Sequence, residues 1–368
     1  KDTSRGLGDV YKRQVWVGLI SILICSMLGG MRAVTWTQVA QYIVLIIAYL
    51  IPVFWISSNV GGGIFPHLML GDEVARLGEL EQQFGLVKNS AADMKAAGVP
   101  GGLKYISGTH SGVPEGGMAV WKYLSLAICM MVGTASLPHI LMRYFTTPTV
   151  RAARKSVAWS LFFIFLLYSS APMLATLSKL ALMDPNLPTG IIGKSISEVQ
   201  SIEWVQRWSE VKQVFIADFN GDGILQLNEW FMRGDVVVLA TPEVAGLPFV
   251  ISGLVFAGGM AAAMSTADGL VLAISNALSH DIYYKIINPK AETAKRLLVA
   301  RTLLVIIGAA GAYIASFRLT SILGSVAWAF DFAMSGLFFP LVLGVWWKRA
   351  TRDCLLYTSP SPRDVSLS

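Results

Sequence analysis

The sequence predicts an all-α polytopic membrane protein, and two observations lead to this fold class. Hydrophobic residues make up 54% of the 368 residues and charged residues only 14%, with a mean hydropathy of +0.58. A soluble domain carries about 25% charged residues. Apolar runs close to the roughly 20 residues that cross a bilayer also recur along the chain. We expect seven spans, which are Val15–Met31, Val34–Ser57, Ala119–Met142, Val157–Leu182, Leu247–Ser279, Arg296–Ser316 and Thr320–Trp347.

The basic residues set the expected orientation of these spans. The net charge of +6 would by itself also suit a nucleic-acid-binding protein. Here, however, the basic residues gather in short connections that fall on one side once the spans alternate, which predicts that this side is cytoplasmic. We therefore expect the lipid bilayer, and no nucleic acid, as a partner, with outer loops at 58–118 and 183–246. The basic residues are Arg32, Arg143, Arg151, Arg154, Lys155, Lys285, Lys290, Lys295, Arg296, Lys348 and Arg349.

Residue patterns typical of enzymes are missing from the sequence. It contains no CxxC pair, no HExxH motif and no GxxxxGK[ST] loop. The histidines are too scattered along the chain to suggest a metal site. We therefore expect no enzyme activity and name no catalytic residue.

The two ends differ in composition from the rest of the chain. Lys1–Gln14 and residues 351–368, most clearly Cys354–Ser368, change abruptly from the sequence that they flank. We interpret both as non-native end pieces and take residues 15–350 as an internal fragment of a transmembrane core. The alternative is a pair of ordinary polar tails.

Three stretches resemble one transporter family. They are GGMRAVTWTQVAQ at Gly29–Gln41, GTASLPHILMRYFTTPTVRAARKSV at Gly133–Val157 and AAAMSTADGLVLAISNALSHDIY at Ala261–Tyr283. In this order they are similar to the sodium:solute symporter family, especially to bacterial acetate and other monocarboxylate permeases. The resemblance implies an inverted-repeat, five-plus-five helix fold in a bacterial inner membrane, of which core helices four to ten are present. A small membrane subunit is a further candidate partner.

The polar residues of the fifth expected span form a candidate cation site. Ala262, Ser265 and Thr266 stand at i, i+3 and i+4, so they share one helix face. The resemblance implies that the Ala262 carbonyl and the two hydroxyls bind sodium as the coupling ion. The alternative is that both hydroxyls only bond back to the i−4 carbonyl. Because a carboxylate at membrane depth costs about 2.5–3.5 kcal/mol, Asp268 is a candidate for cation attraction or a gate contact. The alternative is a carboxyl group that is protonated or bonded to Ser, Asn or backbone within the bundle.

The third expected span contains the candidate substrate site. Gly133 and Pro138 interrupt it and free backbone groups that can line a cavity. The side-chain donors nearby are Thr134 and Ser136, few for a sugar. A small carboxylate can instead be held by backbone N–H groups at a half-helix N-terminus, so Gly133, Thr134 and Ser136 are our candidate substrate residues. The alternative is a proline kink with small packing residues.

The second outer loop contains a calcium-type motif. DFNGDGILQLNE, Asp218–Glu229, fits the pattern D-x-[DN]-x-[DN]-G-x₅-E. We expect the preceding segment, Ser195–Ala217, to form the amphipathic entering helix of an EF-hand-like loop, and calcium to stiffen this outer loop. A polar turn that happens to match is the alternative. The expected ligands are Asp218, Asn220, Asp222, the carbonyl of Ile224, Gln226 and Glu229.

These observations predict a sodium-coupled secondary symporter for a small monocarboxylate such as acetate or lactate. Two alternatives stay open. One is a symporter of the same fold for another solute, such as proline or a sugar. The other is the membrane input domain of a signalling protein.

Overall fold

Helices dominate the fold, which is described from a computed structural model. The structure describes residues 3–60, 63, 66–84, 91–100, 104–105, 117–317, 322–351 and 353. Of the two end segments, residues 1–2, 352 and 354–368 therefore lie outside the described residues. The chain forms two compact units, each considered by itself. Unit 1 comprises Lys1–Gly8, Thr35–Gly112 and Lys155–Ser265, and unit 2 comprises Asp9–Val34, Val113–Arg154 and Thr266–Ser368.

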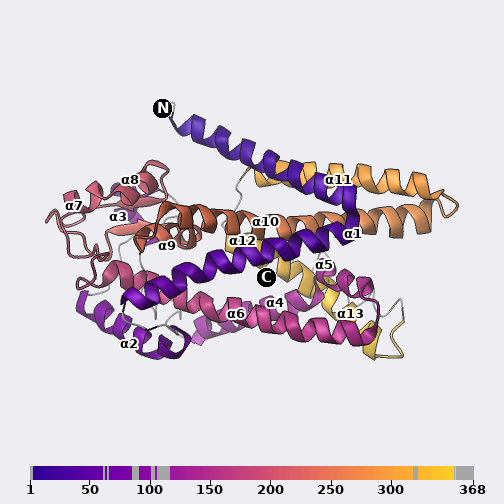
Figure 1. The fold of residues 1–368 in the computed structure, drawn as a ribbon, viewed down its shortest axis with the longest axis horizontal. Coiled ribbons are helices and arrows are strands. Elements are labelled where there is room, and N and C mark those ends of the chain that lie inside the picture. Colours follow the sequence, from indigo (N-terminus) through magenta and orange to yellow (C-terminus); the bar gives the residue numbers. More distant parts are fainter. Residues whose placement is uncertain are drawn as a thin grey trace. The chain divides into compact units, whose positions relative to one another are not determined.

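The membrane-spanning helices agree with the spans expected from the sequence. Within the described residues, five stretches are long and apolar enough to cross a membrane: Val15–Val60, Val150–Met183, Phe249–Ile287, Thr293–Ala315 and Gly324–Trp346. A pair of helices bent by 41°, Leu124–Ser136 and Pro138–Thr146, provides a further span. The first stretch lies in α1 (Thr3–Val60), which is broken at Gly30, where φ is 57° and ψ is −154° (Figure 1). Because this break separates two of the expected spans, the prediction of a multi-pass membrane protein is confirmed.

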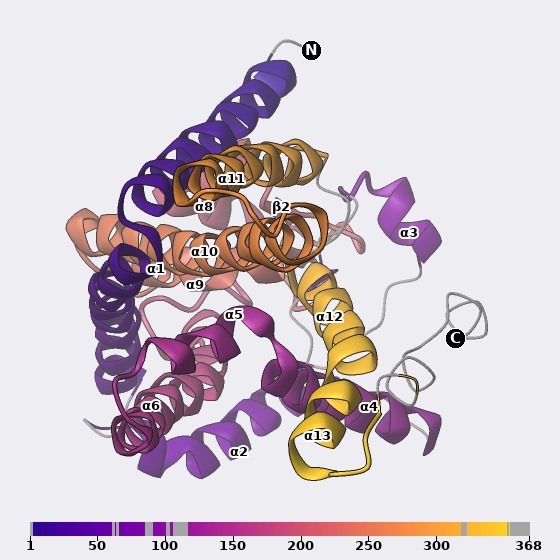
Figure 2. The same ribbon diagram turned by 90° about the vertical axis from the view of Figure 1, so that its right-hand side faces the viewer.

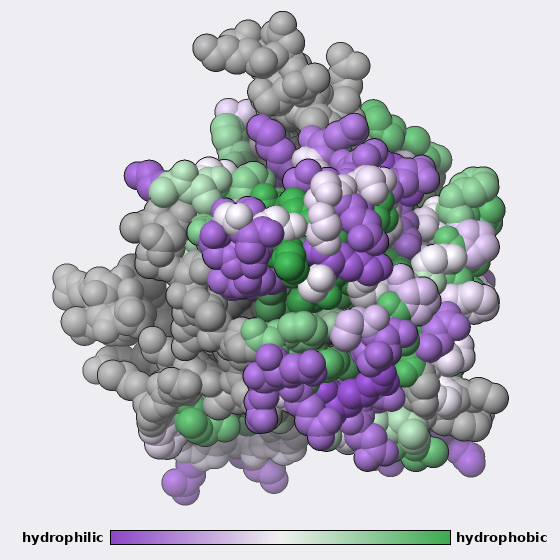
Figure 3. Space-filling view, turned by 90° about the vertical axis from the view of Figure 1, so that its left-hand side faces the viewer, coloured by the Kyte–Doolittle hydropathy of each residue, from purple (hydrophilic) through white to green (hydrophobic). Residues whose placement is uncertain are grey.

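Unit 1 packs the loop elements against the C-terminal ends of α1 and α6 (Val150–Met183). The loop helices are α2 (Pro66–Phe84), α3 (Ala91–Ala96), α7 (Ile196–Ser201), α8 (Glu203–Glu210) and α9 (Val237–Val244), with the 3₁₀ turn η3 (Gly234–Val236). Seen from the side on which α7 and α8 lie, many hydrophilic residues cover these elements (Figure 3). The hydrophobic core beneath them includes Val53, Ile56, Leu77, Leu177, Leu180, Met183, Val199, Val205, Leu225 and Trp230.

A small antiparallel sheet completes unit 1. Its strands are β1 (Lys104–Tyr105), β2 (Val214–Ile216) and β3 (Trp230–Met232), in the order β1-β3-β2. Phe215 pairs with Phe231 in the register of β2 and β3. All three residues of β3 are buried, because Trp230 and Met232 pack into the core of the unit and Phe231 packs with Ala217. The sheet therefore fixes both ends of the segment between β2 and β3.

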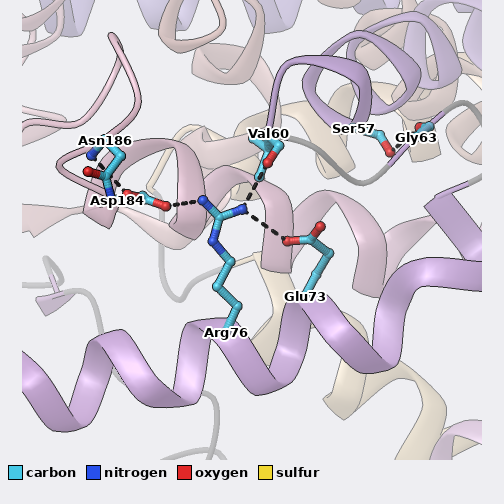
Figure 4. Close-up of polar contacts among 7 residues, drawn as sticks. All are labelled: Ser57, Val60, Gly63, Glu73, Arg76, Asp184 and Asn186. Atoms are coloured by element: carbon cyan, nitrogen blue, oxygen red, sulfur yellow. Dashed lines mark hydrogen bonds and ion pairs between the residues drawn. The ribbon is translucent and has the colours of Figure 1, made fainter.

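Arg76 of α2 joins three elements of unit 1 (Figure 4). Its guanidinium donates to the main-chain oxygen of Val60, at the end of α1, with a distance of 2.8 Å. It also pairs with Asp184, just after α6, and lies 3.8 Å from the carboxylate of Glu73. Asp184 is 1% exposed and accepts a second hydrogen bond from the backbone N–H of Asn186. One side chain thus ties α2 to the ends of two spans.

In unit 2, α4 (Gly117–Ser136) and α12 (Ile322–Ala333) pack closely together (Figure 2). A Cβ atom on Gly133 would lie 2.7 Å from the main-chain oxygen of Phe330, so only glycine permits this approach. The unit also contains the first part of α1 and the end of α10. Its further elements include α5 (Pro138–Leu141), η2 (Met142–Thr146), the π-helix η4 (Ala277–Ile287), α11 (Thr293–Ala315), the π-helix η5 (Met334–Phe338) and α13 (Phe339–Trp346).

Candidate functional site

The candidate cation residues lie on α10 (Phe249–Asn276). Ala262 and Ser265 belong to unit 1, and Thr266 is the next residue along the same helix. The hydroxyl of Ser265 donates to the main-chain oxygen of Ala262 over 2.9 Å. Ser265 therefore bonds back to the i−3 carbonyl. A hydroxyl that donates its hydrogen still keeps two acceptor lone pairs, so this contact leaves the oxygen able to bind a cation.

A residue that the sequence analysis did not single out contacts this segment from α1. The side-chain amide of Gln38 donates to the main-chain oxygen of Ser265 at 2.6 Å. Gln38 is only 7% exposed. Its place in the stretch Gly29–Gln41, which carried part of the family resemblance, was the available signal. A glutamine in an apolar span needs a polar partner, but the sequence could not say which one.

Asp268 lies in unit 2 and is 1% exposed. One of its carboxylate oxygens accepts a hydrogen bond from the hydroxyl of Ser26, on the first part of α1, at 3.3 Å. A buried carboxyl group requires such partners. The contact matches the alternative in which Asp268 is bonded to a serine within the bundle, while the part that this residue plays toward a cation stays a prediction.

The candidate substrate residues lie on α4 just before the break in its span. The hydroxyl of Thr134 donates to the main-chain oxygen of Met130 at 2.5 Å, and Thr134 is exposed. Ser136 is 1% exposed, and its hydroxyl lies 3.0 Å from the main-chain oxygens of Gly133 and Ala333. Gly133 and Ser136 are thus engaged in packing within unit 2. Of the three, Thr134 is the residue whose side chain is accessible.

The half-helix that follows the break is short. α5 runs from Pro138 to Leu141 and continues directly into the 3₁₀ turn η2. The backbone N–H groups of Ile140 and Leu141 both donate to the main-chain oxygen of Leu137, and Pro138 has no N–H group. Few backbone donors therefore remain at this point for an anion.

The calcium-type loop connects β2 to β3 in unit 1. Gly221 and Gly223 both have φ of 73°, a backbone conformation that glycine adopts readily. Asp218 accepts hydrogen bonds from the N–H groups of both glycines, at 2.7 and 3.1 Å. Oxygen atoms of Asp218, Asp222 and Glu229 lie within 4.8 Å of one another. The loop thus brings three carboxylates together around one point.

Hydrogen bonds fix the other side chains of the loop. Glu229 is fully buried and accepts from the N–H groups of Phe219 and Gln226, both at 2.9 Å. Asp222 accepts from the N–H of Ile224 at 2.8 Å, and this bond lowers the pKa of Asp222 below its ordinary value. The side-chain amides of Asn220 and Gln226 also donate to Asp222, at 2.8 and 3.0 Å. These bonds favour the ionised form of Asp222, the form that calcium binding requires.

The expected entering helix is wrong. Within Ser195–Ala217 the structure has α7 and α8, which are separate, and then strand β2. α8 ends before Lys212, which takes a φ of 57°. The β-branched and aromatic residues of Val214–Ile216 favour a strand, and they find a partner in β3. Strands, not helices, therefore flank the loop.

The backbone of the loop is also paired with the segment before α7. The N–H of Leu225 donates to the main-chain oxygen of Lys194, and the N–H of Gly193 donates to that of Leu225, both at 2.8 Å. Ser195 and Ile224 form an isolated antiparallel bridge. This pairing anchors the loop to the rest of unit 1.

Comparison with known proteins identifies the family. The model of the sodium:solute symporter family matches residues 4–197 and 236–359, most of the chain. The chain belongs to the sodium:solute symporter family. The family membership predicted from the three sequence stretches is therefore confirmed. The calcium-type loop, at 218–229, falls between the two matched segments.

Two relatives illustrate the similarity. An uncharacterized symporter of Cupriavidus necator is 36% identical over 423 residues, which cover 95% of this chain and 61% of the relative. A monocarboxylic acid transporter of Corynebacterium glutamicum is 25% identical over 341 residues, covering 91% of this chain and 51% of that protein. The chain thus spans between half and two thirds of the length of these two relatives.

Proposed function

We propose that the complete protein containing this chain is a sodium-coupled symporter for a small monocarboxylate in a bacterial inner membrane. The observation that carries the proposal is the set of oxygens on α10, at Ala262, Ser265 and Thr266. Membership of a sodium:solute symporter family supports sodium as the coupling ion. A relative named as a monocarboxylic acid transporter supports the substrate class.

The chemistry of the α10 residues suits sodium. Carbonyl and hydroxyl oxygens are hard, uncharged ligands, which hard cations prefer over nitrogen or sulfur. None of the three residues carries a carboxylate, so a divalent ion would keep most of its charge uncompensated. A monovalent cation is the better match for such a neutral set.

On the substrate side, we propose that Thr134 contacts the carboxylate. Its hydroxyl is on an exposed residue, whereas Gly133 and Ser136 are buried against neighbouring backbone. Gly133 and Ser136 would then keep α4 in place beside the substrate. Thr134→Val, which replaces the hydroxyl by a methyl group, should raise the acetate concentration for half-maximal uptake without changing the sodium dependence.

Uptake of radiolabelled acetate tests the proposal in cells that express the complete protein. Ser265→Ala and Thr266→Ala should each raise the sodium concentration needed for half-maximal uptake by about five- to a hundred-fold, since a lost ligand costs about 1–3 kcal/mol. Ser252→Ala is the control, because Ser252 is a serine of the same helix outside the candidate set. Normal sodium dependence in both variants would refute sodium binding at α10.

Competition identifies the solute in the same assay. Unlabelled acetate or lactate should suppress uptake, whereas proline and glucose should leave it unchanged. Suppression by proline or glucose alone would replace the monocarboxylate with that solute. Sodium binding without any uptake would favour a sensor domain.

We also propose that the loop Asp218–Glu229 binds calcium. The converging carboxylates of Asp218, Asp222 and Glu229 support this, together with the hydrogen bonds that fix their positions. A single loop outside the cell binds with a dissociation constant of about 10⁻⁴–10⁻³ M. The loop already has its backbone bonds, so calcium would stiffen it rather than fold it.

Terbium luminescence tests this second proposal with purified complete protein. Trp230 directly follows Glu229 and is buried, so it can pass excitation energy to terbium in the loop. Calcium should displace the terbium, and Glu229→Gln should weaken binding strongly. Glu203→Gln is the control, because Glu203 lies on nearby α8 with a side chain 85% exposed. Equal signals from both variants would rule out the site.

A further inference from the structure

A hollow lies between the ends of two neighbouring spans of unit 2. The π-helix η4 ends the apolar stretch Phe249–Ile287, and α11 forms the next one, Thr293–Ala315. The two helices pack against each other and are joined by the short connection Asn288–Glu292 (Figure 1). The hollow that they form has a volume of about 200 Å³. The residues that line it include Ser279, His280, Tyr284, Thr293, Arg296 and Leu297.

Arg296 is held in a defined orientation at this hollow. Its Nε donates to the main-chain oxygen of Ala291 at 3.0 Å. The carbon at the centre of its guanidinium lies 3.9 Å from the centre of the Tyr284 ring, which is a cation–π contact. Its two terminal nitrogens, Nη1 and Nη2, form no hydrogen bond or ion pair with any of the residues that the structure describes. They are therefore available as donors to a ligand.

The surroundings of Arg296 are positively charged. Between residues 277 and 301 the chain has five basic and two acidic residues, which gives a net charge of +3. Of the two acids, Asp281 already accepts a hydrogen bond from Lys285 at 3.0 Å. The ligand that complements this charge is an anion. The basic residues are Lys285, Lys290, Lys295, Arg296 and Arg301, and the acidic ones are Asp281 and Glu292.

Exposed apolar side chains continue from the hollow along both helices. Leu297, which lines it, is 52% exposed, and Leu298 beside it is 65% exposed. On η4, Ile282 is 44% exposed. These three residues lie further inside the two apolar stretches than Arg296 and Tyr284 do. We therefore expect the polar end of the hollow at the level of the lipid headgroups and the apolar side chains at the level of the acyl chains.

We infer that this hollow binds the headgroup of an anionic phospholipid, with the phosphate on Nη1 and Nη2 of Arg296. The planar guanidinium suits phosphate, because its donors can contact two oxygens at once. The hollow is smaller than the roughly 300–1,000 Å³ of pockets that enclose a drug-sized ligand, so it holds a headgroup while the acyl chains lie along Leu297 and Leu298. Basic pockets between spans bind anionic headgroups on the cytoplasmic side, the side on which the basic residues place this end. The inference does not depend on the proposed sodium or calcium binding.

Native mass spectrometry of the purified complete protein tests the inference by titration with dioleoylphosphatidylglycerol. Dioleoylphosphatidylcholine, which has the same acyl chains and no net charge, should bind at least about tenfold more weakly. Arg296→Gln should weaken the binding of phosphatidylglycerol about tenfold, because charge-assisted hydrogen bonds to the phosphate are lost. Lys295→Gln is the control, because Lys295 precedes Arg296 on α11, has the same charge and does not line the hollow. It should stay within about twofold of the parent protein, as expected for an exposed charge.

A second variant tests the positioning of the guanidinium. Tyr284→Leu keeps Arg296 and removes the ring against which it packs, so it should weaken the binding of phosphatidylglycerol about threefold. The melting temperature of each variant without added lipid shows whether it is folded. If Arg296→Gln did not fold, Tyr284→Leu would decide, and normal binding by this variant would overturn the inference.

Three other results would also overturn it. Equal weakening in Arg296→Gln and Lys295→Gln would show a general attraction to a basic surface rather than a site. Equal binding of the two lipids would show that the hollow does not recognise an anionic headgroup. Inorganic phosphate that displaced phosphatidylglycerol at an equal concentration would show that the site holds a soluble anion and not a lipid.

Discussion

Removing the side chain of Arg76 should destabilise the protein more than any surface ion pair does. Asp184 has a side chain only 2% exposed, so Arg76→Ala would leave a buried carboxylate whose one partner among the described residues is the N–H of Asn186. Loss of one partner from a buried pair costs about 3–5 kcal/mol. Because the Arg76 side chain is itself 36% exposed, water can partly replace it. We therefore expect Arg76→Ala to lower the free energy of unfolding by about 2–3 kcal/mol, less than for a fully buried pair.

Replacing the partner of Arg76, Asp184, should destabilise the protein less. Asp184→Asn still accepts the Asn186 bond, and Arg76 keeps its bond to the Val60 carbonyl. We expect a loss of about 1 kcal/mol, the usual net value of one hydrogen bond. Arg207→Ala is the control, because its partners lie 3.5 and 3.9 Å away and its side chain is 54% exposed. Such surface pairs contribute about 0–1 kcal/mol.

Thermal unfolding of the purified protein in detergent measures these differences. Arg76→Ala should lower the melting temperature by about 5 °C, from the usual relation between free energy and melting temperature, and Asp184→Asn by less. The order of the three variants is the critical result. If Arg76→Ala melted together with Arg207→Ala, the guanidinium would not stabilise the junction of α1, α2 and α6, and the reasoning would be wrong.

Three further predictions concern other parts of the chain. Burial raises the pKa of Glu73, against the lowering effect of Arg76. The ionised form of Glu73 therefore destabilises the folded state, and the stability should fall as the pH rises through this pKa. Glu73→Gln should remove that part of the pH dependence of the melting temperature. Gly133→Ala should cost about 1–3 kcal/mol through overpacking against α12, whereas Gly311→Ala, with open space around it, should change stability by less than half of that. A cysteine at Thr149 in the complete protein should react with membrane-impermeant reagents only from inside, and one at Ser209 only from outside. The opposite labelling would show that the predicted orientation of the spans is wrong.

The spans could be predicted because their signal is local. An apolar run of about 20 residues identifies a membrane helix whatever it packs against. Gly30 could likewise be suspected as a break, since it lies in a Gly-Gly pair between two such runs. The helix expected at Ser195–Ala217 failed for the opposite reason. β2 forms because Phe215 pairs with Phe231, a residue beyond the loop, and helical periodicity contains no information about such a partner.

The candidate cation site could be predicted from the sequence only in part. Ser265 and Thr266 could be found because their spacing on one helix is visible in the sequence. Gln38 was visible only as a polar residue within a span, because its partner Ser265 lies 227 residues further along the chain. A contact between distant segments needs the folded arrangement. The packing of Ser136 against Ala333 escaped the sequence analysis for the same reason.

The backbone pairing of Leu225 with Gly193 and Lys194 has a consequence for how the outer loop would respond to calcium. Two calcium loops that pair with each other can share a conformational change, and binding to one then strengthens binding to the other. Here the pairing strand comes from an ordinary segment of the same chain, which brings no second ion. Occupancy would then rise hyperbolically, from about 10% to 90% over roughly two decades of concentration, as for any single independent site. Such a loop would respond gradually to the calcium concentration of its surroundings and could not act as a sharp on–off trigger. A calcium isotherm with a Hill coefficient clearly above one would contradict this.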